Sequence, residues 1–426
     1  MFNVVSPESV GLSSDRLQRL SSWLDDQVSG DRVSGASVLV GRHGKAVFFE
    51  ATGDCDKEHS RAFRKDTVVR IYSMTKPITS VVAMMLYEEG CFQLDDPVAK
   101  YIPEFKEVKV WAGEGDIGNV VVCNSPMLVR HIMSHTSGLT YGFMNSNPVD
   151  EAYRDNEMGR FEDLSEWVSH LATIPLMCQP GSQWNYSVST DVLGKLVEIW
   201  SGRTLEQFFS ERLFEPLGMV DTGFHVKEEN HDRFSALYEP LVGPSMGSLK
   251  GPDPAERHGL KLREPYNESP YLKPTKHYSG GGGLVSTMND YARFCQMLMS
   301  GGELEGARIL SPATIRHMRM NHLPDNKDMA AMGQPVWSET NYDGIGFGLG
   351  FAVVMDPVKA SIIASPGEHH WGGAASTFFW LDPLEDLYVI FLTQLIPSST
   401  YPIRRELRVR VYQSLVESNS KNSLEY

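Results

Sequence analysis

Cysteine and basic residues are both scarce in this sequence of 426 residues. The five cysteines lie far apart, and no two of them have the spacing of a C-x-x-C motif. An odd, scattered set argues against a disulfide framework or a zinc ribbon and favours buried free thiols in a reducing compartment. Lysine and arginine number 39 against 54 aspartate and glutamate residues, for a net charge of −15. Because this charge repels phosphate backbones and anionic membranes, we expect neither nucleic acid nor a membrane as a partner.

Long apolar segments are missing as well. The longest apolar runs, such as Val81–Leu86, are far shorter than the ~20 residues of a membrane-spanning helix. The first residues, MFNVVSP, show no basic stretch followed by an apolar one, so no secretory signal is visible. We therefore expect a cytoplasmic location. Hydrophobic residues at 41% and charged residues at 22% are ordinary for a globular protein and exclude a disordered chain.

The pattern of apolar residues changes twice along the chain. Helical spacing over residues 14–29 precedes two mostly buried segments, 35–40 and 46–49, which predict a hairpin. From residue 66 to about 280, helical segments alternate with loops rich in proline and glycine. The remaining residues predict a helix at 287–300 and four strands at 348–354, 361–364, 376–381 and 387–392. A closing helix at 402–417 and a frayed tail at 418–423 follow.

The two ends of the chain together predict one antiparallel sheet flanked by helices, with a mainly helical part inserted between them. This architecture belongs to the α/β (α+β) class. We assign residues 1–65 and 285–426 to an α/β domain and residues 66–284 to a mainly helical domain.

A candidate nucleophile opens the predicted helix 74–90. In Ser73-Met74-Thr75-Lys76, the serine and the lysine are three residues apart, so they share a helix face and can form a hydrogen bond. The positive end of the helix dipole favours an anion formed at its first residues. A lysine in a partly dry pocket can act as a general base near neutral pH. Because S-x-x-K is short and recurs at Ser418–Lys421, chance combined with helix capping is the alternative explanation.

Three other motifs have weaker support. Ser245 lies in a G-x-S-x-G motif, but the proline-containing segment after it cannot form the helix that a nucleophile elbow needs. His131 and His135 have the spacing of zinc ligands, yet Ile132 stands where the general-base glutamate would be, which favours structural histidines. Gly280–Gly283 lacks the frame of a dinucleotide site, so we expect backbone that passes close to another element.

Two further segments matter only if they lie beside a Ser–Lys pair. Tyr186 ends a loop just before the predicted helix 189–201, where it is either a packing residue or a second group that handles protons. Trp371-Gly372-Gly373-Ala374 stands at the start of a predicted C-terminal strand. Small residues there let a substrate approach the strand, whose N–H groups can stabilise an oxyanion. A bulge or close packing is the alternative explanation for these glycines.

In this order along the chain, the S-x-x-K helix, the loop tyrosine and the glycine-rich strand resemble the serine β-lactamase and penicillin-binding-protein superfamily. The resemblance is to its class C-like branch, and within that branch to the family VIII carboxylesterases. It covers residues 8 to 415 and implies a β-lactamase-like fold with the active site in the cleft between the two domains. Further matching stretches are Tyr72–Ile78, His135–Leu139, Pro180–Ser187 and Gly281–Thr287.

The resemblance implies a serine hydrolase that cleaves carboxylic esters, preferably with short acyl chains, through an acyl-enzyme on Ser73. Lys76 and Tyr186 would share the base and acid roles, and which of them takes the serine proton stays open. The backbone amides of Ser73 and Ala374 would form the oxyanion hole beside Trp371–Gly373. No metal or organic cofactor is implied, and the expected partner is a small-molecule ester. The oligomeric state is not given by the sequence.

Two positions depart from the class C β-lactamases. Val188 stands where those enzymes have the asparagine of Y-x-N, and Trp371 stands where they have the lysine of K-T-G. Both changes favour neutral esters over β-lactams. A β-lactamase, a D-aminopeptidase or an acyltransferase would use the same site. A non-catalytic penicillin-recognising protein is the alternative of a different class, and the intact Ser73, Lys76 and Tyr186 argue against it.

Overall fold

Strands from both ends of the chain form one sheet in the computed structural model, which describes residues 2–143, 147–243, 258–333 and 342–419. The sheet has eight strands in the order β12-β13-β14-β15-β16-β1-β2-β3, and all its pairs are antiparallel. The N-terminal strand β1 (Gly35–Arg42) lies between β2 (Lys45–Asp56) and the C-terminal strand β16 (Leu387–Thr393). The predicted α/β class, with an antiparallel sheet flanked by helices, is confirmed.

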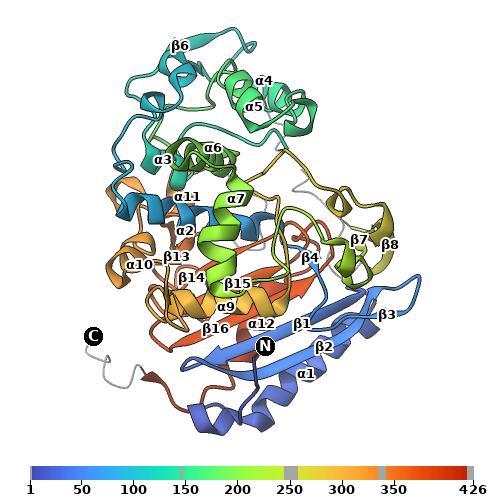
Figure 1. Cartoon of the computed structure of the whole chain (residues 1–426). Coiled ribbons are helices and arrows are strands. Elements are labelled where there is room, and N and C mark those ends of the chain that lie inside the picture. Colours follow the sequence, from blue (N-terminus) through green and yellow to red (C-terminus); the bar gives the residue numbers. More distant parts are fainter. Residues whose placement is uncertain (1, 144–146, 244–257, 334–341, 420–426) are drawn as a thin grey trace.

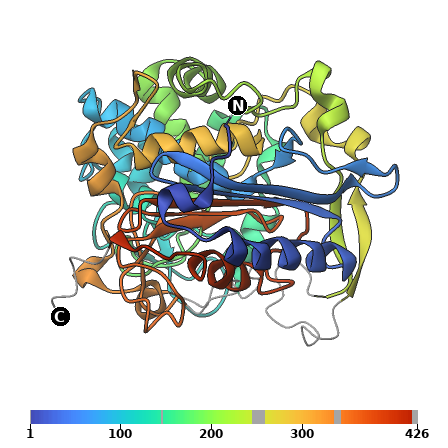
Figure 2. The same cartoon turned by 90° about the horizontal axis from the view of Figure 1, so that it is seen from below.

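Helices cover both faces of this sheet. On one face, α1 (Ser14–Ser29) lies beside α12 (Ile403–Tyr412), and α9 (Met288–Met299) covers the other face (Figure 2). Side chains of alternate residues in β1 point to opposite faces of the sheet. Val38 packs into the core beneath α1 and α12, whereas Leu39 packs into the core on the side of α9.

The segment between the two halves of the sheet is mainly helical and lies above the sheet in Figure 1. Its central helix α2 (Thr75–Glu88) is buried from Thr75 to Leu86 and packs against α6 (Ser189–Ser201). A helix buried on all sides belongs to the centre of a domain, so the S-x-x-K segment starts deep in the molecule. The other helices are α3 (Val129–Met133), α4 (Pro148–Arg154), α5 (Leu164–Leu171), α7 (Leu205–Phe209), α8 (Glu215–Leu217), α10 (Pro312–Met318) and α11 (Met329–Met332).

Among the described residues, four strand pairs form separate two-stranded sheets, and β4, which pairs with β9, ends shortly before α2 begins. The predicted helix 14–29 and the first hairpin are confirmed by α1, β1 and β2. The division into domains stays a prediction. The remaining strands are β3 (Arg61–Ala62), β4 (Val69–Arg70), β5 (Lys109–Trp111), β6 (Val120–Val122), β7 (Leu237–Val242), β8 (His258–Glu264), β9 (Val285–Ser286), β10 (Glu303–Leu304), β11 (Ala307–Arg308), β12 (Ile345–Phe347), β13 (Ala352–Val354), β14 (His369–Gly372) and β15 (Phe378–Asp382).

Several C-terminal predictions are wrong. The segment 348–354 is not one strand, because Gly348 N–H donates to the Phe351 carbonyl and closes a turn between β12 and β13. Residues 361–364 form no strand, since Ser361 ends a turn with a φ of +54° and Ile363 is half exposed. Strand β14 takes that place in the sheet, and the Trp371–Ala374 segment stands at its end rather than at the start of a strand.

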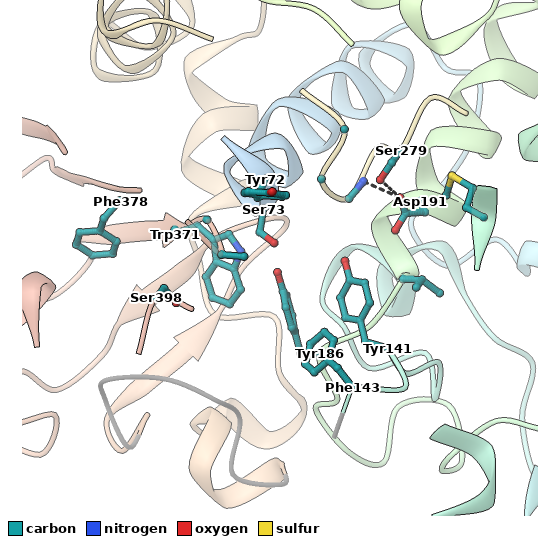
Figure 3. A pocket seen from close by; sticks show the side chains of 18 of the residues that line it. Tyr72, Ser73, Tyr141, Phe143, Tyr186, Asp191, Ser279, Trp371, Phe378 and Ser398 are labelled. Atoms are coloured by element: carbon teal, nitrogen blue, oxygen red, sulfur yellow. Dashed lines mark hydrogen bonds between the residues drawn. The ribbon is translucent and has the colours of Figure 1, made fainter. Parts of the chain in front are cut away.

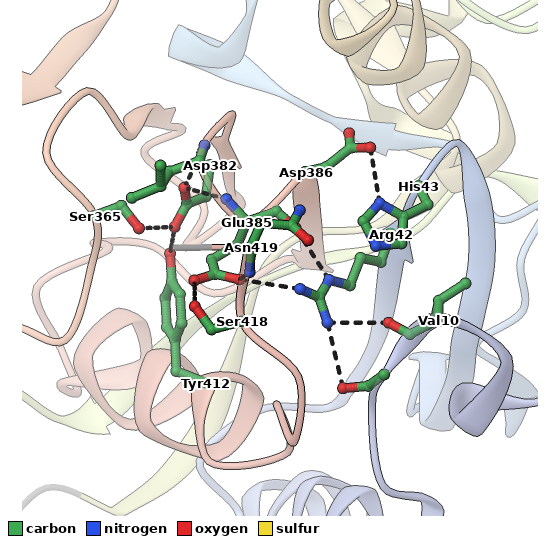
Figure 4. Close-up of polar contacts among 12 residues, drawn as sticks. Val10, Arg42, His43, Ser365, Asp382, Glu385, Asp386, Tyr412, Ser418 and Asn419 are labelled. Atoms are coloured by element: carbon green, nitrogen blue, oxygen red, sulfur yellow. Dashed lines mark hydrogen bonds and ion pairs between the residues drawn. The ribbon is translucent and has the colours of Figure 1, made fainter. Parts of the chain in front are cut away.

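Two buried polar clusters connect the strand ends with α12 and the chain termini; Figure 4 shows the first of them and the contact of Asp382 with Tyr412 from the second. In the Arg42 cluster, the guanidinium donates to the Glu385 carboxylate at 3.0 Å and to the Val10 carbonyl at 2.9 Å. Ser418 Oγ and Asn419 N–H also donate to Glu385, so the prediction of a frayed tail is wrong for these two residues.

The second cluster, the Glu368 cluster, lies at the same end of the sheet. Arg408 forms an ion pair with the fully buried Glu368. The Tyr412 hydroxyl lies 2.9 Å from Glu368 Oε2 and 2.7 Å from Asp382 Oδ2. Within the described ranges, no helix is long and apolar enough to cross a membrane.

Candidate active site

Ser73 lies in a short 3-10 turn, Tyr72–Met74, that leads directly into α2. Tyr72 has a φ of +43°, a left-handed conformation that a bulky residue keeps only where its surroundings hold it. Ile71, just before it, is held on both sides. Its N–H donates to the Leu284 carbonyl at 3.1 Å, and its carbonyl accepts from Met74 N–H at 3.0 Å. The Ser73 side chain is thereby fixed at the start of the helix.

The buried amine of Lys76 is the centre of the polar contacts around Ser73. Its Nζ donates to Ser73 Oγ at 3.2 Å, to the Tyr141 hydroxyl at 2.7 Å and to the Gly281 carbonyl at 2.6 Å. The three-residue spacing therefore brings serine and lysine together as predicted. The rings of Tyr141 and Tyr186 flank the amine at 5.1 and 4.8 Å from their centroids, within the range of cation–π attraction.

Tyr186 reaches the same place from the loop before α6. This loop is held by Asn185, whose N–H donates to the His135 carbonyl at 2.8 Å and whose side chain donates to the Leu139 carbonyl at 2.7 Å. The hydroxyl ends of Tyr186 and Ser73 point toward one another (Figure 3). The third predicted side chain thus joins the other two.

The end of β14 lies against the turn that carries Ser73. A Cβ on Gly373 would lie 2.3 Å from the Ile71 carbonyl oxygen, so only glycine permits this approach. Ala374 packs in the same small apolar cluster as Tyr72. The Trp371 ring, 6% exposed, lies 5.4 Å from the ring of Tyr186. The glycine-rich segment therefore borders the candidate nucleophile, as the sequence predicted.

Sequence analysis missed several residues here. Arg404 of α12 lies beside Gly372, and its Nη2 is 3.4 Å from the Gly373 carbonyl, so a cation lies near this strand although Trp371 replaces the lysine of K-T-G. Burial raises the pKa of Tyr141 well above its usual value. The signal for Tyr141 was its position two residues after the matching stretch His135–Leu139. No spacing pointed to Arg404.

Asp191 is a further buried group that sequence analysis missed. Its Oδ1 accepts hydrogen bonds from Ser279 Oγ at 2.5 Å and from Gly281 N–H at 3.0 Å (Figure 3). Burial raises the pKa of Asp191, and the Lys76 ammonium opposes that rise. A Cβ on Gly281 would lie 2.4 Å from Asp191 Oδ2, which confirms that the glycine run passes close to another element.

A cavity of about 1020 Å³ opens above Ser73. Its size is at the upper end of the range for small-molecule sites. The lining comes from the helical segment as well as from the sheet and α12, and it combines aromatic side chains with charged ones such as Arg404, Arg405 and Arg408 of α12. Members of this lining include Tyr72, Phe143, Trp167, Tyr186, Tyr271, Trp371 and Phe378. Such a wall suits an apolar organic molecule.

The motif of His131 and His135 does not form a metal site in the described residues. Helix α3 ends at Met133, so His135 lies beyond it with a φ of +55° and its Nδ1 bonds to Ser187 Oγ. Burial lowers the pKa of His131 to about 4. No group of three or more potential ligands in the part of the chain that the structure describes is placed to hold a metal ion. Ser245 lies in residues 244–257, outside the described residues.

The fold and the sequence have clear relatives. The profile of the family described as Beta-lactamase matches residues 20–413. The chain belongs to this family and is a serine hydrolase of the β-lactamase fold whose neighbours include esterases and acyltransferases. The resemblance to the β-lactamase and penicillin-binding-protein superfamily is thereby confirmed.

Three particular relatives define the neighbourhood more closely. Protein Rv1367c of Mycobacterium tuberculosis is 35% identical over 370 residues, which cover 86% of each chain. Esterase EstB of Burkholderia gladioli is 30% identical over 402 residues, 92% of this chain and 94% of EstB. The solved structure of EstCE1, described as a hydrolase with promiscuous acyltransferase activity, has a TM-score of 0.76 at 26% identity and covers 93% of this chain and 99% of its own.

Proposed function

We propose that this protein hydrolyses carboxylic esters through an acyl-enzyme on Ser73. The observation that carries this proposal is the contact of Ser73 Oγ with the buried Lys76 amine at 3.2 Å, at the base of a cavity with aromatic walls. A serine is a weak nucleophile unless a neighbouring base accepts its proton. Lys76 and Tyr186 are the two groups in position to do so.

Acylation and deacylation would use the same groups in opposite directions. Ser73 Oγ attacks the ester carbonyl carbon while its proton passes to Lys76 or Tyr186, and the alcohol leaves with a proton returned by the same pair. Water then attacks the acyl carbon and gives its proton to the pair, and the carboxylic acid leaves as Ser73 regains its hydrogen. An ammonium has three donors and no acceptor, so Lys76 must be neutral to act as the base.

The backbone supplies the oxyanion hole in this proposal. The N–H groups of Ser73, at the start of α2, and Ala374, just beyond β14, would bind the oxygen of the tetrahedral intermediate. The close approach of Gly373 to Ile71 supports this pairing, because it brings the end of β14 to the Ser73 turn. The glycines leave the strand backbone open to the substrate.

Esters fit this site better than β-lactams do. Val188 and Trp371 both line the cavity and offer no amide or ammonium to a lactam, and the Arg404 guanidinium, which also lines the cavity, already contacts the Gly373 carbonyl. Trp371 and Tyr186, whose rings lie 5.4 Å apart, both line the cavity and give the acyl group an apolar wall, and short acyl chains are the proposed preference. The 30% identity to esterase EstB supports the same substrate class.

Acyl transfer to an alcohol is the second candidate. A cavity of about 1020 Å³ has room for an acceptor alcohol beside a small acyl group, and the description of EstCE1 names acyltransferase activity. In such a reaction, an alcohol replaces water in the second half of the cycle.

A chain-length series of p-nitrophenyl esters tests the proposal, with intact-mass detection of the acyl adduct. We expect an adduct on Ser73, and a kcat/KM for the acetate or butyrate at least ~10²-fold above that for nitrocefin, which corresponds to a difference of about 2.7 kcal/mol or more in the activation barrier. Comparable efficiencies would contradict the ester preference. A D-amino acid p-nitroanilide and an added alcohol acceptor test the peptidase and transferase alternatives. We expect EDTA to leave the rate unchanged.

A further inference from the structure

We propose that Asp191 is a positioning residue for the reaction at Ser73. Its buried carboxylate holds the Gly281 carbonyl on Lys76 and places a negative charge close to the buried amine. This inference rests on the proposed ester hydrolysis and deepens it, because it assigns a group that orients the amine in contact with Ser73.

One residue, Gly281, connects the carboxylate to the amine. Its N–H donates to Asp191 Oδ1 at 3.0 Å, and its carbonyl accepts from Lys76 Nζ at 2.6 Å. Ser279 Oγ donates to the same carboxylate oxygen at 2.5 Å (Figure 3). A shift of the Asp191 carboxylate would therefore also move the Gly281 carbonyl that binds Lys76.

Two helices clamp this segment and prevent it from moving away. The Gly280 carbonyl accepts from Thr79 Oγ1 of α2 at 2.7 Å, and a Cβ at Gly280 would lie 2.7 Å from the Thr190 carbonyl of α6. A Cβ at Gly281 would overlap the Asp191 carboxylate. The absence of side chains along the glycine run thus lets backbone fit between α2 and a carboxylate on α6.

The charges also support the proposal. Lys76 is 1% exposed and Asp191 is 3% exposed, and opposite charges interact strongly where water is excluded. Asp191 lies in the first turn of α6, where the helix dipole stabilises an anion. The other titratable groups that face the amine from neighbouring segments are Tyr141, Tyr186 and His135. Burial lowers the pKa of His135 well below its usual value, so this ring is neutral.

The hydrogen bonds of Lys76 fit an ammonium. It has three donors, and its three oxygen partners are Ser73, Tyr141 and Gly281. With Asp191 ionised, loss of a proton from this amine leaves the carboxylate without a counter-charge. Replacing the carboxylate by an amide removes that penalty, so proton transfer at the site should set in at a lower pH.

The pH dependence of the reaction tests this directly in Asp191→Asn. We expect one limb of the profile of kcat/KM for p-nitrophenyl butyrate to move to lower pH by about one unit. The pH-independent rate falls about 10-fold as the Gly281 loop loses its partner. The control is Asp290→Asn, which alters another buried aspartate in the first turn of a helix, α9, away from Lys76. In this control, both limbs of the pH profile of kcat/KM should coincide with those of the wild type. Unmoved limbs in Asp191→Asn, or a shift to higher pH, overturn the proposal.

Ser279→Ala separates the charge from the hydrogen bond. This variant keeps the carboxylate and removes one of its donors, so we expect a lower rate with limbs within about 0.3 pH units of wild type. A shift as large as that of Asp191→Asn would mean that packing alone moves the profile, and the proposed role of the charge would be wrong.

Lys76→Met tests the charge of Asp191 through protein stability and needs no catalytic activity. The test can be carried out even if Asp191→Asn does not fold. Without the ammonium, the buried Asp191 carboxyl binds its proton more tightly in the folded than in the unfolded chain, so the variant loses stability relative to wild type as pH rises from 4 to 7. A constant difference across that range overturns the inference. Failure of a fluorophosphonate to label Ser73 in wild type would instead refute the proposed function.

Discussion

Two buried charged clusters in this protein are built in different ways. In the Arg42 cluster the guanidinium meets the Glu385 carboxylate directly, at 3.0 Å, and both groups are less than 10% exposed. Around Ser73, no ion pair that the structure describes joins Lys76 to Asp191, and the peptide of Gly281 lies between them. A direct pair fixes both charges. Lys76 instead contacts the neutral Gly281 carbonyl and the hydroxyls of Ser73 and Tyr141, and such contacts allow the proton transfers that hydrolysis requires.

The largest effect on turnover is expected from removing the attacking oxygen, Oγ of Ser73. We expect Ser73→Ala to lower turnover by about 10⁴-fold or more while the melting temperature stays unchanged, because little volume is lost. Ester assays and thermal unfolding measure the two effects. Ser245→Ala is the matched control and should be nearly silent. Activity lost in the control but kept in Ser73→Ala would refute the assignment of the nucleophile.

The next largest effect should come from the two proton-handling groups. Lys76→Ala and Tyr186→Phe are each expected to lower kcat by about 10²–10⁴-fold at neutral pH, since each removes help with proton transfer. Steady-state kinetics checks this, and the acyl adduct seen by mass spectrometry shows which half of the reaction slows. A loss below about fivefold in either variant would remove that residue from the mechanism.

The Arg42 cluster should respond in stability and not in rate. Arg42→Met leaves Glu385 buried without its cation, which costs about 3–5 kcal/mol in the free energy of unfolding. Urea denaturation measures the loss, and kcat per folded molecule should not change. The double variant with Glu385→Leu should recover much of the stability. If kcat falls with stability in the single variant, the two clusters are coupled and the contrast between them fails.

The smallest effect concerns acid stability in the Glu368 cluster. Burial alone would raise the pKa of Glu368, but the Arg408 guanidinium and the His370 ring outweigh it and lower the pKa to about 2. The stabilisation is therefore complete above pH 4.5 and is lost as pH falls from 4.5 toward 2. Glu368→Gln should be less stable than wild type at pH 7 by about 2 kcal/mol, and the difference should shrink in acid. A difference independent of pH would contradict this.

The signals that succeeded in the sequence were local. Ser73 and Lys76 meet because three residues on a helix return to the same face, and β15 and β16 follow from apolar runs separated by a turn. The strand predicted at 361–364 failed because a positive φ at Ser361 and exposure of Ile363 depend on surroundings that a short apolar run does not reveal.

The parts of the site that were missed are contacts between distant segments. Asp191 acts on the glycine run from another helix, and Arg404 reaches the end of β14 from α12. No spacing within one element encodes such meetings, since each is created by the packing of the whole chain. Tyr141 is intermediate, because it lies beside a recognisable stretch while its contact with Lys76 is tertiary.

The pairing of β1 with β16 also determines when this protein can acquire its shape during synthesis. Thr393 Oγ1 donates to the Gly35 carbonyl, 358 residues earlier in the chain. A contact of such length closes a very large loop and is slow to form. Until β16 has left the ribosome, β1 has one unpaired edge, and an unpaired edge is a site of aggregation. A chain that terminates before Leu387 therefore lacks the strand that joins the two halves of its sheet and leaves the edge of β1 open to other chains.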